Sequence, residues 1–237
     1  MRLQADFSLE SKSLNADFGT FQNASDGGYE RGLQKGRQAE YDRFWDAYQE
    51  NGNSPGMFRY KYWNDETFKP KYDMHYTGDS SDAFNQCAVT DMKAILEQQG
   101  VVLDFSQVTH FMRGFQQANV THLPVLDFSN IQSSAAIFQY CSNLVSVDKI
   151  ISNSNFTADF RYCGALEHVR FEGVICQPPL FASSSKLTNE SVQSIIDHLK
   201  DLTGQTSQTL TFHKDVGSRL TAAQKAAVTA KNWTLVY

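Results

Sequence analysis

The chain has 237 residues, of which 41% are hydrophobic and 13% aromatic, so it can bury a substantial core and general disorder is not expected. Its formal net charge is −5, which leaves no broad basic field to attract nucleic acid or an anionic membrane. Residues 1–10 lack the apolar centre of a secretory signal, and no run of about 18 apolar residues exists, so no membrane insertion is expected.

The first 52 residues predict an anchor rather than a core. Residues 1–27 repeat Ala-Asp-Phe and indicate an extended arm that needs a partner surface to become ordered. Residues 28–52 predict a helical, oligomerising segment with glycines every four residues and then an aromatic stripe. The candidate oligomerisation residues are Gly28, Gly32, Gly36, Tyr41, Phe44, Trp45 and Tyr48. Packing of this helix on its own chain, or a flexible linker, are the alternatives.

Residues 53–83 are rich in aromatic side chains and predict an N-terminal cap over the repeats that follow. The same aromatics are interleaved with basic residues, a pattern that could also stack on sugars or bases. These basic residues are Arg59, Lys61, Lys69 and Lys71. The cap is the favoured interpretation, because exposed aromatic patches are rare.

A pattern that occurs four times predicts a repeat architecture over residues 84–186. Its copies begin at Phe84, Phe115, Phe138 and Phe160, and the later copies recur every 22 or 23 residues, as in leucine-rich repeats. We expect each repeat to contribute one short strand and one tighter segment, with equivalent residues stacked in ladders. The first interval is longer and has room for a helix over 92–99. Accidental self-similarity in an ordinary α/β domain is the alternative.

A small residue stands three positions after each phenylalanine: Cys87, Ala118, Cys141 and Cys163. Because alanine fills the same position as cysteine, the pattern indicates that this position requires small size rather than sulfur chemistry. We therefore expect buried free thiols in this ladder, although the four cysteines of the chain would also permit two disulfides.

Residues 187–237 predict a C-terminal helix-strand cap. Thr188 and Thr221 are expected N-caps of two helices, and strands are expected at 209–212 and 233–237. The predicted fold class is therefore an α/β repeat: a short leucine-rich-repeat solenoid with an N-terminal helical or extended anchor and a C-terminal βαβ-like cap.

The candidate binding residues are those that alternate with the apolar positions of each predicted strand and so face outward. They are Thr90, Asp91, Thr121, His122, Val145, Ser146, Glu167, His168, Arg170 and Glu172. Their regular spacing predicts a flat or concave recognition surface, and the alternative is plain solvated surface.

Catalytic motifs are absent, and no two histidines stand at the spacing of a helical metal pair, so we expect no enzyme, no metal and no cofactor. The alternative is a glycan hydrolase that draws its acids from Asp79, Asp82 or Asp91.

The F-x-x-C-x-x-L-x-x-V pattern resembles the BspA-like class of leucine-rich repeats. Two further segments are Arg-Gln-Ala-Glu-Tyr-Asp-Arg-Phe-Trp-Asp-Ala-Tyr-Gln-Glu-Asn-Gly at 37–52 and Thr-Phe-Lys-Pro-Lys-Tyr-Asp at 67–73. With these segments, the layout of the chain is similar to that of repeat proteins encoded by phages and prophages of gut Firmicutes. The resemblance implies a virion structural or adhesion role. It implies a homo-oligomer, with a trimer favoured. The arm would contact other virion proteins, and the repeats would contact a host cell-surface protein or glycan. A cytoplasmic or cell-surface bacterial interaction scaffold is the alternative.

Overall fold

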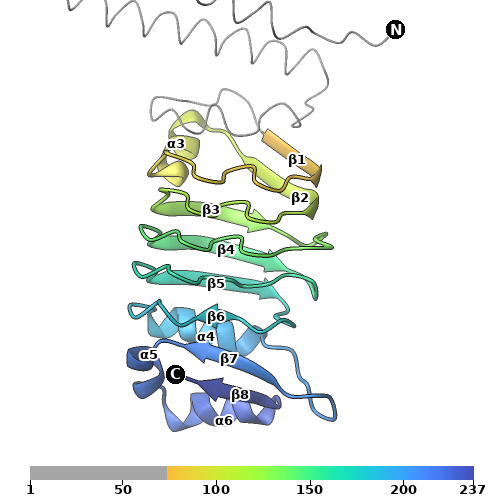
Figure 1. The fold of residues 1–237 in the computed structure, drawn as a ribbon, viewed down its shortest axis with the longest axis vertical. Coiled ribbons are helices and arrows are strands. Elements are labelled where there is room, and N and C mark those ends of the chain that lie inside the picture. The colour runs from red at the N-terminus through yellow and green to blue at the C-terminus, as the bar shows by residue number, and fades with distance from the viewer. Residues whose placement is uncertain (1–73) are drawn as a thin grey trace, which may run out of the picture. The chain divides into compact units, whose positions relative to one another are not determined.

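A computed structural model describes residues 74–237, except for the side chains of His75 and Thr77. Its strands are β1 (Met74–Asp79), β2 (Leu103–His110), β3 (His122–Asp127), β4 (Ser146–Ser152), β5 (His168–Gly173), β6 (Leu180–Phe181), β7 (Gln208–Phe212) and β8 (Trp233–Val236). Its helices are α3 (Met92–Gln99), α4 (Asn189–His198), α5 (Lys214–Ser218) and α6 (Ala222–Ala230). Figure 1 shows the strands lying one beneath the next.

Several predictions concern residues outside the described range. These are the extended arm (1–27), the oligomerising segment (28–52) with its glycines and aromatics, and the first part of the aromatic cap (53–73). They remain predictions.

The predicted leucine-rich-repeat solenoid is wrong. The strands do not form one continuous sheet but three small open parallel sheets, in the orders β1-β2, β3-β4-β5 and β6-β7-β8. Within the predicted C-terminal cap, β7 pairs in parallel with β8 and also with β6 from the preceding region.

The physical reason lies in the segments between the matched phenylalanines. Met92 and Leu96 are buried one helical turn apart and follow the N-cap Asp91, so this segment forms α3. The equivalent segment of β5 alternates buried Val169 and Phe171 with exposed residues, which is the period of a strand. Copies that share their turns therefore differ in secondary structure, and no single sheet can run through them.

The predicted phenylalanine column is nevertheless confirmed. Phe84, Phe115, Phe138 and Phe160 are all buried, and their rings stack at centroid distances of 4.7, 5.8 and 4.6 Å in order along the chain. Phe181 continues the column at 5.1 Å from Phe160. Stacked rings at this spacing add to the free energy of burial, so the column stabilises the sheets beside it.

The turns around the column share one backbone conformation. The residue before each small position has a positive φ, between 57° and 65°: Gln86, Gln117, Tyr140 and Tyr162. Each turn also bonds to the next, as when the Phe115 amide donates to the Ile137 carbonyl at 2.9 Å. The turns thus keep the phenylalanines in register although the segments between them differ.

The small positions hold buried side chains, as predicted, and the four cysteines are free thiols rather than disulfides. The Cys141 thiol donates to the Phe115 carbonyl at 2.8 Å, and the Cys163 thiol donates to the Phe138 carbonyl at 3.0 Å. Burial raises the pKa of the Cys87 thiol to about 12. The neighbouring Cys141 thiol, together with burial, also raises the pKa of Cys163.

We expect these thiols to stay unreactive in the native protein. At pH 8 a thiol with a pKa of about 12 is ionised in roughly one molecule in ten thousand, and only the thiolate attacks Ellman's reagent. The number of reacted thiols, measured by absorbance after addition of this reagent, should rise slowly in buffer. In urea it should rise rapidly to four per chain. Rapid labelling of two or more thiols without urea would contradict this burial.

Candidate binding site

The three-stranded sheet β3-β4-β5 lies between two helices. Helix α3 packs beside β3, and helix α4 packs beside β5; Figure 1 shows the strands in this order with α3 above them and α4 below. The Thr121 amide before β3 donates to the Thr90 carbonyl before α3, and the Thr188 amide before α4 donates to the Glu167 carbonyl before β5. The helices therefore occupy the places that further strands would take.

Serine side chains of α4 satisfy the open edge of β5. The Ser191 hydroxyl accepts the Val169 amide at 3.0 Å, and the Ser194 hydroxyl accepts the Phe171 amide at 2.9 Å. An unpaired edge strand is a template for aggregation, and these bonds occupy its donors. The edge of the sheet is thus closed by a helix, which leaves its outer face as the accessible surface.

A hollow of about 860 Å³ lies over β4 and β5 against the first turn of α4, and we call it the trough. A helix with its side chains is about 10–12 Å thick, whereas neighbouring strands are about 4.8 Å apart, so α4 rises above the sheet as a wall. The residues that line the trough are Val125, Ser146, Val147, Asp148, Lys149, His168, Val169, Arg170, Glu190 and Ser191.

Half of the candidate binding residues lie on this outer face. Ser146, His168 and Arg170 line the trough itself. The Nδ1 atom of His122 is 2.8 Å from the Ser146 hydroxyl, and Glu172 forms an ion pair with Lys149, which lines the trough. The sheet register places His122 opposite Ser146 and Ser146 opposite His168, so the three side chains form one row across the strands.

Four other candidates lie in the loops directly before α3, β3, β4 and β5: Thr90, Thr121, Val145 and Glu167. Their carbonyls hold the next segment, as when the Val145 carbonyl accepts the amides of Glu167 and His168 at 2.9 and 3.1 Å. Asp91 is the N-cap of α3, where its carboxylate accepts the Ala94 amide at 2.9 Å. These positions contribute backbone order, and a binding role for any candidate stays a prediction.

A bulge concentrates charge in the trough. Between Val147 and Ile150, β4 sets Asp148 and Lys149 against the single residue Arg170 of β5. Lys93 of α3 reaches across β3 to Asp148 at 2.8 Å, and this contact raises the pKa of the Lys93 ammonium. Four charged side chains from three elements therefore line the trough: Asp148 and Lys149 of β4, Arg170 of β5 and Glu190 of α4.

Sequence reasoning missed Lys93, Asp148, Lys149 and Glu190. Nothing in the spacing places α3 beside β3 or α4 beside β5, so the contributions of the two helices could not be read from the chain. Asp148 and Lys149 interrupt the apolar alternation of β4, and that interruption was the available signal of the bulge.

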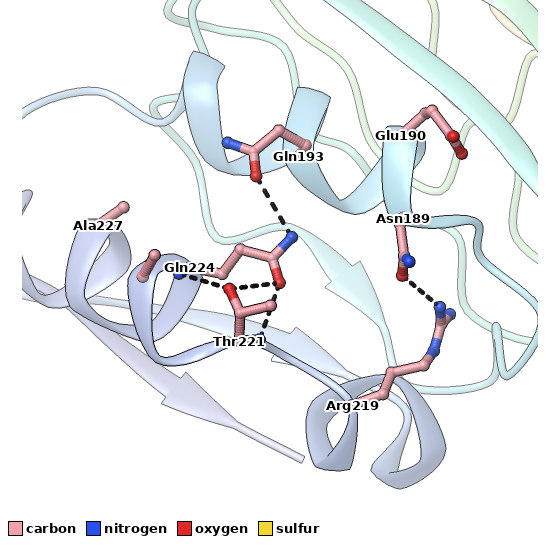
Figure 2. Close-up of a pocket in the computed structure, with 8 residues that line it drawn as sticks. Asn189, Glu190, Gln193, Arg219, Thr221, Gln224 and Ala227 are labelled. Carbon is pink, nitrogen blue, oxygen red and sulfur yellow. Dashed lines mark hydrogen bonds between the residues drawn. The ribbon is translucent and has the colours of Figure 1, made fainter.

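A second hollow of about 620 Å³ lies between α4 and α6 and shares Glu190 with the trough. Figure 2 shows that its polar side chains pair across it: Gln193 with Gln224 at 3.3 Å, and Asn189 with Arg219 at 2.9 Å. Gln224 also completes the capping box of α6 with Thr221, which confirms the predicted N-cap. Because these groups already bond to one another, this hollow is a weaker candidate than the trough.

The three aspartates considered as catalytic acids have separate local partners. The Asp79 carboxylate accepts the Ser81 amide, Asp82 pairs with Arg113 at 2.8 Å, and Asp91 caps α3. The first two contacts involve the turn 81–86, and the third lies at the start of α3.

Between residues 74 and 237, no group of three or more histidine, cysteine, aspartate or glutamate side chains is placed to hold a metal ion. Over the same range no helix is long and apolar enough to cross a membrane.

Comparison of the chain with protein-family models, with curated proteins and with solved structures finds no match in any of the three. The resemblance to BspA-like repeat proteins therefore rests on the sequence pattern alone.

Proposed function

We propose that this chain is a non-enzymatic binding protein that recognises a cell-surface protein or glycan through the trough. The observation that carries the proposal is the row of polar side chains on β3, β4 and β5, which lies on a hollow beside the wall formed by α4. Such a concave polar surface is able to surround a ligand and to make several hydrogen bonds with it at once.

The floor of the trough is well suited to binding because its backbone is held on both sides. Parallel pairing fixes β4 between β3 and β5, and the buried residues Val147 and Val169 anchor the strands to the core. The backbone of such a floor loses little freedom when a ligand arrives, so less of the interaction free energy is lost to ordering.

The biological setting that we propose is a phage virion, as a tail- or capsid-associated protein released by lysis. Its arm (1–27) would contact other virion proteins, and residues 28–52 would form the homo-oligomer, a trimer. Mass spectrometry of purified phage particles tests this setting. Detection of the chain at a fixed ratio to the other virion proteins supports it, whereas its exclusive recovery from particle-free bacterial lysate favours the scaffold alternative.

Filling the trough should abolish recognition. We expect His168→Trp to lower adsorption of the full chain to a panel of bacterial cells at least about tenfold, because the indole would occupy space that the ligand needs. His168 is exposed, so the substitution should not disturb the core. Flow cytometry of fluorescently labelled protein measures the adsorption.

The matched control is Thr229→Trp, which adds the same indole to an exposed position of α6. This variant should adsorb as the unchanged chain does. If His168→Trp and Thr229→Trp both adsorb normally, the trough is not the recognition surface.

A further inference from the structure

Two charged side chains of the trough have no ion-pair partner among residues 74–237. Asp148 is held by Lys93 at 2.8 Å, and Lys149 holds Glu172 at 2.7 Å. Arg170 and Glu190 line the same trough, yet neither forms an ion pair with any residue between 74 and 237. A ligand can therefore bind Arg170 without first breaking an ion pair within this part of the chain.

Arg170 is well placed to bind an anion. It lies on β5 between the buried residues Val169 and Phe171, so its own side chain extends from the outer face of the sheet. A guanidinium offers donors in a planar fork that matches a carboxylate. His168, two residues earlier, extends from the same face and provides a second polar contact.

We propose that the trough binds an acidic glycan with isolated carboxylates, one of which is held by Arg170. This inference rests on the proposed function and names the ligand class for that same site. The Ser146 hydroxyl, the carboxylates of Asp148 and Glu190, and the exposed Val125 side chain are suited to the hydroxyls and the apolar ring faces of the sugars.

The surrounding carboxylates favour this ligand over a dense polyanion. Asp148 and Glu190 line the trough, and Glu172 lies beside it through its ion pair with Lys149. Poly-glutamate, nucleic acid or a heavily sulfated glycan would bring several negative charges close to these groups and would be repelled. A sugar chain with spaced carboxylates and many hydroxyls places one charge at Arg170 and neutral donors at the acids.

Isothermal titration calorimetry with the full chain tests the proposal, with hyaluronate, whose carboxylates stand only on alternate sugars, as the acidic glycan. Dextran serves as the neutral glycan, heparin as the sulfated glycan and poly-glutamate as the acidic peptide. We expect hyaluronate to bind most tightly, and Arg170→Gln to weaken its binding about tenfold or more, because a charge-assisted hydrogen-bond pair is lost. The control Lys214→Gln removes an exposed charge of α5 outside the trough and should change binding by less than about twofold.

Three results would overturn the inference: no binding of hyaluronate, equal binding by the Arg170→Gln variant, or binding of dextran, heparin or poly-glutamate at least as tight as that of hyaluronate. These failures are distinguishable from failure of the proposed function. If His168→Trp abolishes adsorption to cells while hyaluronate does not bind, the trough is the recognition surface and its ligand is of another class.

Discussion

Replacing Phe138 with alanine is expected to lower the free energy of unfolding by about 3–5 kcal/mol, which is the usual range for a buried phenylalanine. Phe138 is 0% exposed and stacks on Phe115 and Phe160 with interplanar angles of 7° and 8°. The substitution therefore opens a cavity in the middle of the column, and the turns on both sides are too tightly hydrogen bonded to close it. Urea unfolding followed by circular dichroism measures the change.

The matched control is Tyr140→Ala, two residues away in the same turn. Tyr140 is 44% exposed and stacks only on the outside of the turn, on Tyr162 at 4.4 Å. Its removal should cost about 1 kcal/mol, mostly through the lost ring contact. If the two variants lose equal stability, the phenylalanine column does not support the fold.

Replacing Trp233 with alanine should also destabilise the protein by about 3–5 kcal/mol. Trp233 begins β8, is 3% exposed, and its indole nitrogen donates to the Lys200 carbonyl at 2.8 Å. The alanine variant loses the buried indole and leaves that carbonyl without its partner. Because β8 pairs only with β7, we expect the loss to open the last sheet first.

Hydrogen exchange on the Trp233→Ala variant separates the local effect from the global one. Amides of β7 and β8 should exchange much faster than in the unchanged chain, while amides of β3, β4 and β5 keep most of their protection. Uniform loss of protection across all three sheets would mean that the sheets unfold as one unit, contrary to this expectation.

Local features of the fold could be predicted from the sequence because their causes are local. Thr188 and Thr221 cap α4 and α6 as expected, since a threonine before an apolar-periodic run is enough to define a helix start. The phenylalanine column followed from the spacing of like residues. The division into three sheets could not be predicted, because the spacing of like residues does not show which strands pair with one another.

In the candidate site, too, features with local causes could be predicted and features set by packing could not. Alternation along β5 correctly places His168 and Arg170 away from the core, because a strand sends successive side chains to opposite faces. The pairing of Lys93 with Asp148 depends on α3 lying beside β3, and the contribution of Glu190 depends on α4 lying beside β5. Those neighbours are set by the packing of the whole unit, so sequence spacing could not supply them.

Hydrogen exchange of the full chain with and without saturating hyaluronate is the most direct test of the trough as the recognition surface. We expect added protection in β4, in β5 and in the first turn of α4, with no change in the exposed turns around Tyr140 and Tyr162. Protection confined to those turns, or to β6, β7 and β8, would contradict it.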